Sequence, residues 1–508
     1  MSPRRVALLA PRLSLAALLA LSLAPAASRA ALPPDPCAVL LAALGPRLAD
    51  ATCFESADLT TNNPATTPAN NSIAGLPPLA FTPQTDRNVI SPDPPFRTPI
   101  TKAVPGVQLD ARLADDPAGE ARFLLRVPAD WSGSLVVAGA SGTRSEFNGD
   151  FAWSDLVVQK GYAYASQNKR ILNLFLAAIS VAPPASDPLA CRLNPTSAIW
   201  VHFYDDDPGK PFTQWGPAIV AAAGIARDGL LALEERPPRY TYAVGTSNGG
   251  YQVRRALELA PHVFDGGVDW EGTFVDPAAP NILTDLPPAI LNFPAYAASG
   301  FDPTSAAAKN IVAAGYPPDI VAAGGVSLWG LYNAQFWEVT QCQWQKRLDP
   351  TYDTYGSGTG TYDYAARVSQ SDVFAELAAF ENTGDLRRPL ITVAGTMDAL
   401  LPIEHHARAY ARKVAAARAA DAAKGREDDR HAPYRLYEVQ NGNHIETFKN
   451  TFPQLELIQP HAQRAFELLV RFVEEHREPL PPDQCVQRGG AISASPAQKG
   501  QCAKLLEP

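Results

Sequence analysis

Residues 240–251 read Tyr-Thr-Tyr-Ala-Val-Gly-Thr-Ser-Asn-Gly-Gly-Tyr, and the rest of the chain can be organised around them. The apolar, β-biased start predicts a strand, the residues after Ser247 predict a helix, and Gly-x-Ser-x-Gly predicts a sharp turn between the two. Gly245 and Gly249 suit this turn because side chains there would collide with the neighbouring strand and helix. Ser247 would then be exposed at a helix N-terminus, where the helix dipole favours a developing anion. The stretch predicts a nucleophilic serine; the alternative is an ordinary glycine turn in a chain with 34 glycines.

Strand and helix patterns alternate on both sides of this turn. Short apolar runs typical of strands buried on both faces alternate with helical segments, which predicts a mostly parallel, doubly wound α/β sheet. The expected strands are 107–113, 121–127, 134–138, 162–166, 240–244, 263–268, 389–394 and 434–439, and the expected helices are 151–160, 217–235, 248–260, 403–419 and 457–475.

A base and an orienting acid for Ser247 follow two of the later strands. Asp398 comes just after the strand at 389–394, and His444 just after the strand at 434–439. Loops that follow parallel strands meet at one edge of the sheet, so the three side chains are expected to converge. His444 would take the proton from Ser247, while Asp398 would fix the imidazole tautomer and stabilise its charged form.

Other histidines and acids fit these roles less well. His405 and His406 lie in the helical segment after Asp398, where a surface or capping role is expected. His262 is too near Ser247 in sequence to swing back, and Asp385 precedes its strand and so faces the wrong edge.

An oxyanion site is expected from two backbone segments. Small residues follow the strand at 134–138, so the backbone N–H groups of Ser141 and Gly142 can approach a developing negative charge, together with the N–H of Asn248. The alternative for 139–144 is a tight strand-to-helix turn without a catalytic role.

The parallel rhythm stops between residues 273 and 382, where aromatic residues crowd. We interpret this segment as a lid whose aromatic side chains form mainly its own small core. The expected organisation is a leader at 1–30, an N-terminal extension at 31–102, a catalytic domain at 103–272 and 383–478, the lid at 273–382, and a tail at 479–508.

The N-terminus predicts export. Arg4 and Arg5 precede the apolar run 13–23, and Ser28 and Ala30 suit a cleavage site, so residues 1–30 resemble a secretory signal peptide. The apolar run is too short to span a bilayer, and stable membrane insertion is not expected. Sec and Tat export both remain open. The protein is expected to be secreted or periplasmic.

Six cysteines in an exported chain predict disulfides. Among 15 possible pairings, pairing by proximity joins Cys37 to Cys53 and Cys485 to Cys502, which leaves Cys191 with Cys342. None has the C-x-x-C spacing of a zinc or redox site, so a catalytic thiol is not expected. The serine chemistry predicted for Ser247 needs no metal or organic cofactor, so none is expected.

Composition bounds the partners. Charged residues make up 19% of the chain and the net charge is −9, with no basic stripe, which argues against nucleic acid as a partner. Asp205, Asp206 and Asp207 lack the alternating spacing of calcium loops, so an acidic turn is expected there.

With these residues in place, the segment from about 134 to 478 resembles the α/β-hydrolase superfamily. Within it, the stretch 136–144, Trp153, the stretch 160–165 and the Ser-Asn-Gly-Gly sequence at 247–250 resemble secreted 3-hydroxybutyrate oligomer hydrolases. The tannase and feruloyl esterase family is a second relative. That family typically joins cysteines beside its nucleophile and histidine, whereas this chain has Thr246, Asn443 and Ile445 there.

The resemblance and the three side chains together lead to the hypothesis of a serine ester hydrolase that acts through an acyl-enzyme on a small or oligomeric ester. Rivals are a tannase or feruloyl-type aromatic esterase, a serine peptidase on the same fold, and a binding module without catalysis.

Overall fold

The computed structural model describes residues 32–68, 83–87, 90–142, 145–171, 174–177, 190–192, 200–203, 212–278, 280–351, 362–425, 431–476 and 478–508. The expected signal peptide, Arg144 and the triple aspartate at 205–207 lie outside these residues.

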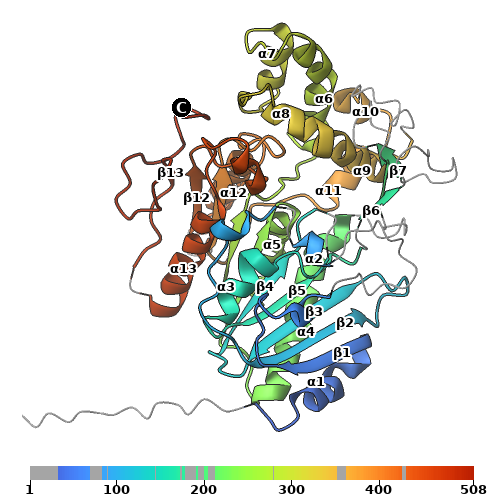
Figure 1. The fold of residues 1–508 in the computed structure, drawn as a ribbon, viewed down its shortest axis with the longest axis vertical. Coiled ribbons are helices and arrows are strands. Elements are labelled where there is room, and N and C mark those ends of the chain that lie inside the picture. The colour runs from blue at the N-terminus through green and yellow to red at the C-terminus, as the bar shows by residue number, and fades with distance from the viewer. Residues whose placement is uncertain are drawn as a thin grey trace, which may run out of the picture.

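A ten-stranded sheet crosses the described part of the chain in the order β1-β2-β3-β5-β4-β9-β10-β11-β12-β13 (Figure 1). Neighbours from β5 to β13 pair in parallel, whereas β1, β2, β3 and β5 pair antiparallel. The strands are β1 Leu48–Ser56, β2 Gly106–Leu113, β3 Arg122–Pro128, β4 Ser134–Gly139, β5 Ala163–Gln167, β9 Tyr240–Thr246, β10 Gly266–Trp270, β11 Leu390–Gly395, β12 Tyr434–Val439 and β13 Gln484–Val486. The expected α/β sheet is therefore present, and its parallel strands end at one common edge.

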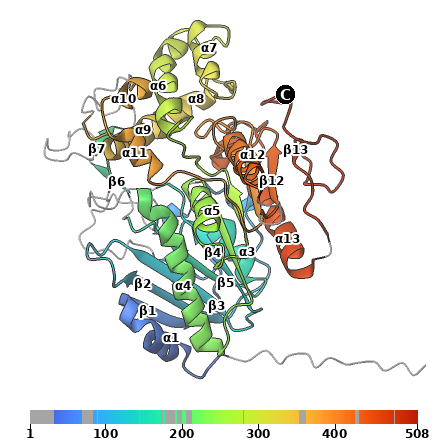
Figure 2. The same ribbon diagram turned by 180° about the vertical axis from the view of Figure 1, so that it is seen from behind.

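Helices cover both faces of this sheet, as the two opposite views show (Figures 1 and 2). One apolar core holds side chains of α1, α4, α5 and α12, and a second holds side chains of α3 and α13. Successive residues of β4 alternate between the two cores, Leu135 with the first and Val136 with the second. The helices are α1 Pro36–Leu44, α3 Asp155–Val158, α4 Trp215–Glu234, α5 Asn248–Leu259, α12 Ala407–Ala423 and α13 Gln459–Glu475.

Helix α4 and the turn before it, residues 212–234, are long and apolar enough to cross a membrane by length and composition. However, 56% of the apolar window is buried, and α4 packs against α1, α5 and β5. The helix therefore serves as a core element of the sheet.

The two ends of the chain contribute more regular structure than their sequences suggest. The extension at 31–102 was expected to lack periodic elements, but α1 and β1 lie within it, and β1 lengthens the sheet through β2. Leu40 and Leu44 of α1 are fully buried. In the tail, β13 adds a parallel strand beside β12. Local patterns missed these elements because their pairing partners are distant in the sequence.

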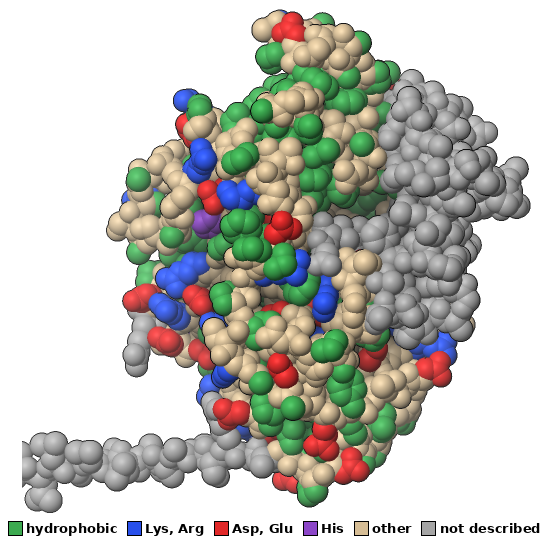
Figure 3. Space-filling model, viewed as in Figure 1, with side chains coloured by type: hydrophobic (Ala, Val, Ile, Leu, Met, Phe, Trp, Pro, Cys, Tyr) green, Lys and Arg blue, Asp and Glu red, His purple; other side chains and the backbone are tan. Residues whose placement is uncertain are grey.

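The described residues between 273 and 382 (273–278, 280–351 and 362–382) form a helical layer above the carboxyl edge of the sheet (Figure 1). Its elements are α6 Ile282–Ala298, α7 Ala306–Ala313, α8 Leu328–Tyr332, the π-helix Asn333–Trp337, α9 Glu338–Leu348, α10 Tyr364–Arg367 and α11 Val373–Ala378. A third apolar core fills this layer, with Trp329, Tyr332, Trp337 and Trp344 almost fully buried. The surface view shows apolar side chains over the same layer (Figure 3). Exposed apolar residues of this layer include Leu291, which is 55% exposed.

Three disulfides join the pairs expected from the sequence, which confirms that pairing: Cys37–Cys53, Cys191–Cys342 and Cys485–Cys502. The second links the lid helix α9 to the small antiparallel sheet of β6 Leu174–Ala177, β8 Trp200–Phe203 and β7 Ala190–Arg192. Disulfides of this number are typical of proteins from oxidising compartments.

Candidate active site

The turn at Ser247 has the strained geometry expected from its sequence. Ser247 joins β9 to α5 with φ 59° and ψ −123°, in the left-handed region that non-glycine residues rarely occupy. A Cβ on Gly245 would strike the carbonyl of Gly249, and one on Gly249 would strike the carbonyl of Gly139. The Ser247 N–H donates to the Trp270 carbonyl at 2.9 Å, and Thr273 donates to the Ser247 carbonyl at 3.2 Å. These contacts hold the serine at the carboxyl edge of the sheet.

Asp398 and His444 meet at the same edge. His444 Nδ1 lies 2.8 Å from Asp398 Oδ2. The side chain of His444 is 1% exposed and that of Asp398 is 2% exposed. The other oxygen of Asp398 accepts from the N–H groups of Leu400 at 2.8 Å and Leu401 at 2.7 Å, which fixes the carboxylate. Because the carboxylate can only accept, Nδ1 is assigned the proton, and Nε2 is left as the base.

The Ser247 hydroxyl belongs to this edge but is not bonded to the imidazole. Among the described residues it makes no hydrogen bond, and its residue is 7% exposed. Catalytic hydrogen bonds are often long in a free enzyme and tighten when substrate binds. The structure thus joins Asp398 to His444 and places Ser247 on a turn at the same edge of the sheet.

The expected oxyanion donors differ in their engagement. Asn248 is the first residue of α5, so its N–H lacks a partner within the helix. The Ser141 N–H instead donates to Asn148 Oδ1 at 3.0 Å, which also accepts from the Ser141 hydroxyl at 2.7 Å. This contact gives the Ser141 N–H an internal partner, and its expected role as an oxyanion donor stays a prediction. Gly142, with φ 39°, remains the candidate donor of that turn.

A buried lysine supports the same turn. Lys169 Nζ donates to the carbonyl of Ala140 at 3.0 Å and to that of Ser141 at 3.2 Å, and the side chain is fully buried over Trp215. The sequence analysis overlooked it. Lys169 could have been found from its position just after the strand at 162–166, which places it at the same edge of the sheet as the other site residues.

A second overlooked residue is Glu271. The sequence predicted that the strand before it would end at Val268, but β10 continues to Trp270 and so places Glu271 at the carboxyl edge. Its Oε2 lies 3.6 Å from His444 Nδ1. Burial, reinforced by Asp398, raises the pKa of Glu271 well above its ordinary value.

The lid contacts both loops that carry the acid and the base. The Tyr332 hydroxyl donates to Asn443 Oδ1 at 2.9 Å, beside His444. The Trp337 indole N–H donates to the Ala399 carbonyl at 2.7 Å, beside Asp398. The lid therefore packs directly on the loops of the site.

His405 and His406 also bind the lid, in contrast to the surface or capping role expected for them. Asp285 of α6 lies 2.9 Å from His405 Nδ1 and 3.2 Å from His406 Nε2, and His406 is 2% exposed. Burial alone would raise the pKa of Asp285, but hydrogen bonds from the two histidines outweigh it and lower that pKa. For His405 the opposing effects of burial and Asp285 leave the pKa raised.

Two groups of the described residues have the spacing to hold a metal ion. In the first, Glu271, Asp398 and His444, the 2.8 Å contact is that of a direct hydrogen bond. In the second, Asp385, Asp421 and His431, the guanidinium of Arg387 already lies at both carboxylates. Neither group points to a metal centre.

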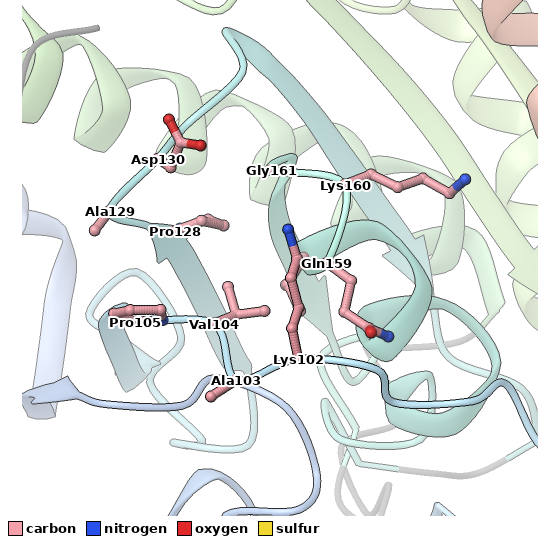
Figure 4. A pocket seen from close by; sticks show the side chains of 11 residues that line it. Lys102, Ala103, Val104, Pro105, Pro128, Ala129, Asp130, Gln159, Lys160 and Gly161 are labelled. Carbon is pink, nitrogen blue, oxygen red and sulfur yellow. The ribbon is translucent and has the colours of Figure 1, made fainter.

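A cavity of about 290 Å³ lies at the opposite edge of the sheet, where the parallel strands begin (Figure 4). Lys102, Asp130, Gln159 and Lys160 line it. Its position separates it from Ser247.

Comparison with solved structures identifies the fold class. An esterase from Aspergillus oryzae superposes with a TM-score of 0.50 at 12% identity, over 85% of this chain and 87% of that one. Feruloyl esterase B from Aspergillus oryzae gives a TM-score of 0.47 at 13% identity, over 85% and 88%. The chain has the α/β-hydrolase fold.

Sequence comparison points to one group within that class. Residues 352–503 match the family described as 3HB-oligomer hydrolase (3HBOH). A D-(-)-3-hydroxybutyrate oligomer hydrolase from Burkholderia thailandensis is 30% identical over 118 residues, 22% of this chain. The match spans 15% of the length of that relative. The segment that matches the family contains both Asp398 and His444.

Proposed function

We propose that the chain is an exported serine hydrolase that cleaves carboxylic esters, with 3-hydroxybutyrate oligomers as its substrates. The observation that carries the proposal is the hydrogen bond between Asp398 and His444 at the sheet edge that also presents Ser247. The match of residues 352–503 to the 3HB-oligomer hydrolase family supports the choice of substrate.

In the proposed mechanism Ser247 Oγ attacks the ester carbonyl and His444 Nε2 takes its proton. Asp398 accepts the Nδ1–H and stabilises the imidazolium. The N–H groups of Asn248 and Gly142 stabilise the oxyanion of the tetrahedral intermediate. His444 then gives the proton to the leaving alcohol, and a water molecule, activated by the same imidazole, hydrolyses the acyl-enzyme.

Export is part of the proposal. The arginines and apolar run at 1–30 are typical of a signal peptide. Three disulfides suit a periplasmic or extracellular protein. The size of the mature chain, measured by mass spectrometry of the exported protein, tests cleavage after Ala30.

The catalytic test is Ser247→Ala, assayed on p-nitrophenyl butyrate and on dimers and trimers of 3-hydroxybutyrate. We expect kcat to fall about a million-fold, as when a triad serine is removed from a serine protease. Ser495→Ala, in the exposed tail, is the matched control and should keep full activity. Hydrolysis by Ser247→Ala at the wild-type rate would refute the serine mechanism. Cleavage of feruloyl or galloyl esters without cleavage of the oligomers would refute the substrate.

A further inference from the structure

Glu271 occupies a position at the sheet edge that its backbone reaches only under strain. It follows β10 directly, with φ 50°, and is 3% exposed. Such conformations are costly for a side chain other than glycine, and they concentrate where a side chain must be aimed. Here the side chain is aimed at His444.

Both carboxyl oxygens of Glu271 are held by donors of the fold. Oε1 accepts from the Gly395 N–H at 3.2 Å, and Oε2 accepts from the Trp270 indole N–H at 3.1 Å. The same Oε2 lies 3.6 Å from His444 Nδ1, against 2.8 Å for Asp398 Oδ2. One imidazole N–H therefore faces two carboxyl groups, of which one is bonded and the other is within reach of a small movement.

The two carboxyl groups cannot both carry a charge at low cost. Glu271 is faced by Asp398 from the loop after β11, by His444 from the loop after β12, by Glu446 from the turn Glu446–Asn450, and by Tyr332 from the lid. Burial, then Asp398 and Glu446, raise the pKa of Glu271, against the N–H groups of Gly395 and Trp270. Burial and the neighbouring carboxyl group of Asp398 therefore favour the neutral form of Glu271.

We propose that Glu271 is a second positioning acid for His444, which takes over the negative charge and the Nδ1–H when the carboxylate of Asp398 is lost. The proposal rests on the Ser247–His444–Asp398 mechanism above. With Asp398 intact, neutral Glu271 confines the imidazole ring. With Asp398 replaced by Asn, the charge repulsion that disfavours a Glu271 carboxylate is removed, so Glu271 can carry the negative charge beside the imidazole.

The test is a double-mutant cycle of Asp398→Asn and Glu271→Gln, with kcat measured on p-nitrophenyl butyrate from pH 5 to 10. In trypsin, loss of the triad carboxylate costs about 10⁴-fold in kcat. We expect D398N to lose only about 10- to 100-fold and D398N/E271Q to lose about 10⁴-fold. E271Q alone should lose only a few-fold, because Asp398 still holds the imidazole.

Glu446→Gln is the matched control. Glu446 is equally buried, but its Oε1 accepts from the N–H groups of Ile458 at 2.5 Å and Gln459 at 2.7 Å rather than facing the imidazole. D398N/E446Q should therefore retain the activity of D398N. Thermal unfolding checks that each variant is folded. The downfield proton resonance of His444 Nδ1–H gives a readout independent of turnover, and it should persist in D398N and vanish in D398N/E271Q.

The inference is overturned if D398N alone loses about 10⁴-fold and E271Q adds nothing to that loss. It is also overturned if the Nδ1–H resonance disappears in D398N, or if a chelator abolishes activity and a divalent metal restores it. These outcomes leave the proposed function standing as long as Ser247→Ala is inactive. Wild-type activity of Ser247→Ala would instead remove the proposed function itself.

Discussion

The sheet edge and the lid both contribute side chains around Asp398 and His444, but the two regions position these side chains in different ways. At the edge, Ser247, Asp398 and His444 each stand a few residues after a strand, and their positions follow from local turns. In the lid, Tyr332 and Asp285 come from helices far away in the sequence and dock onto loops of the site. The edge supplies the groups proposed to react, whereas the lid supplies groups that hydrogen-bond to the loops that carry them. Mutations should therefore affect rate at the edge, and stability or binding in the lid.

The largest effect is expected at the base. His444→Ala removes the only proposed proton acceptor for Ser247, so kcat should fall about 10⁶-fold with little change in thermal stability. His262→Ala, on the exposed turn after α5, is the control with no expected effect. Turnover and fluorophosphonate labelling of Ser247 would measure the loss. Near-normal labelling of His444→Ala would place the base elsewhere.

A change at Lys169, which holds the proposed oxyanion turn, tests whether this residue affects the rate of the reaction. Lys169→Met leaves the carbonyls of Ala140 and Ser141 without their buried donor, so the N–H groups of this turn should lose their aim. We expect kcat to fall about 10²-fold with a small change in KM, the effect of losing an oxyanion donor. Lys160→Met is the control, because Lys160 pairs with Glu467 at the opposite edge of the sheet. Equal kinetics for the two variants would contradict this role.

Asp285 tests the lid through pH. Because its folded pKa is lowered, its contribution to stability is present above its unfolded pKa near 4 and is lost as pH falls. The folded pKa of His405 is raised, so its contribution is complete below about pH 6.5 and is lost as pH rises. The pKa of His406 is lowered chiefly by burial, so the folded state favours its neutral form. Protonation of His406 at low pH therefore destabilises the folded protein.

Asp285→Asn should therefore destabilise the protein most between about pH 4 and 6.5, by about 1 to 2 kcal/mol. Urea unfolding of wild type and variant from pH 4 to 8 would measure the difference. Asp372→Asn, an exposed change in the same lid at a side chain that makes no capping hydrogen bond, is the control. A stability difference that grows above pH 7 would contradict the assignment of the His405 pair.

The smallest effect is expected from one hydroxyl. Tyr332→Phe removes the hydrogen bond to Asn443, so the loop of His444 should loosen by about 1 kcal/mol and kcat should fall less than about tenfold. Tyr296→Phe removes a bond to Asp319 within the lid, 2.9 Å long, and should lower stability without lowering kcat. The ratio of kcat for Tyr332→Phe to kcat for Tyr296→Phe measures how much the hydrogen bond from the lid to the His444 loop contributes to turnover.

These differences explain what the sequence could predict. Ser247, Asp398 and His444 were predicted because each follows a strand that can be recognised from its own apolar sequence. Glu271 was missed because the last two residues of β10, Asp269 and Trp270, do not continue the small apolar pattern of the strand. The strand was therefore predicted to end at Val268, and Glu271 was not placed at its carboxyl end. The acidic side chain of Asp269 is tolerated in this buried strand because it lies 2.6 Å from the buried guanidinium of Arg254.

The partners of the lid were not predictable for a different reason. Asp285 lies 120 residues from His405, and nothing in either local pattern specifies the other. The edge strands β1 and β13 were missed for the same reason, because their hydrogen bonds go to strands paired only in the folded chain. The disulfides were predicted from proximity and from the single pair left over.

The Cys191–Cys342 bridge closes a ring of covalent bonds that contains Ser247 but excludes Asp398 and His444. A protease that cuts the backbone once between Ser247 and Cys342 leaves one covalently joined molecule while the bridge is intact. After reduction the same cut leaves two fragments, with Ser247 on one and Asp398 and His444 on the other. The bridge therefore keeps the three proposed site residues on one covalent molecule after such a cut.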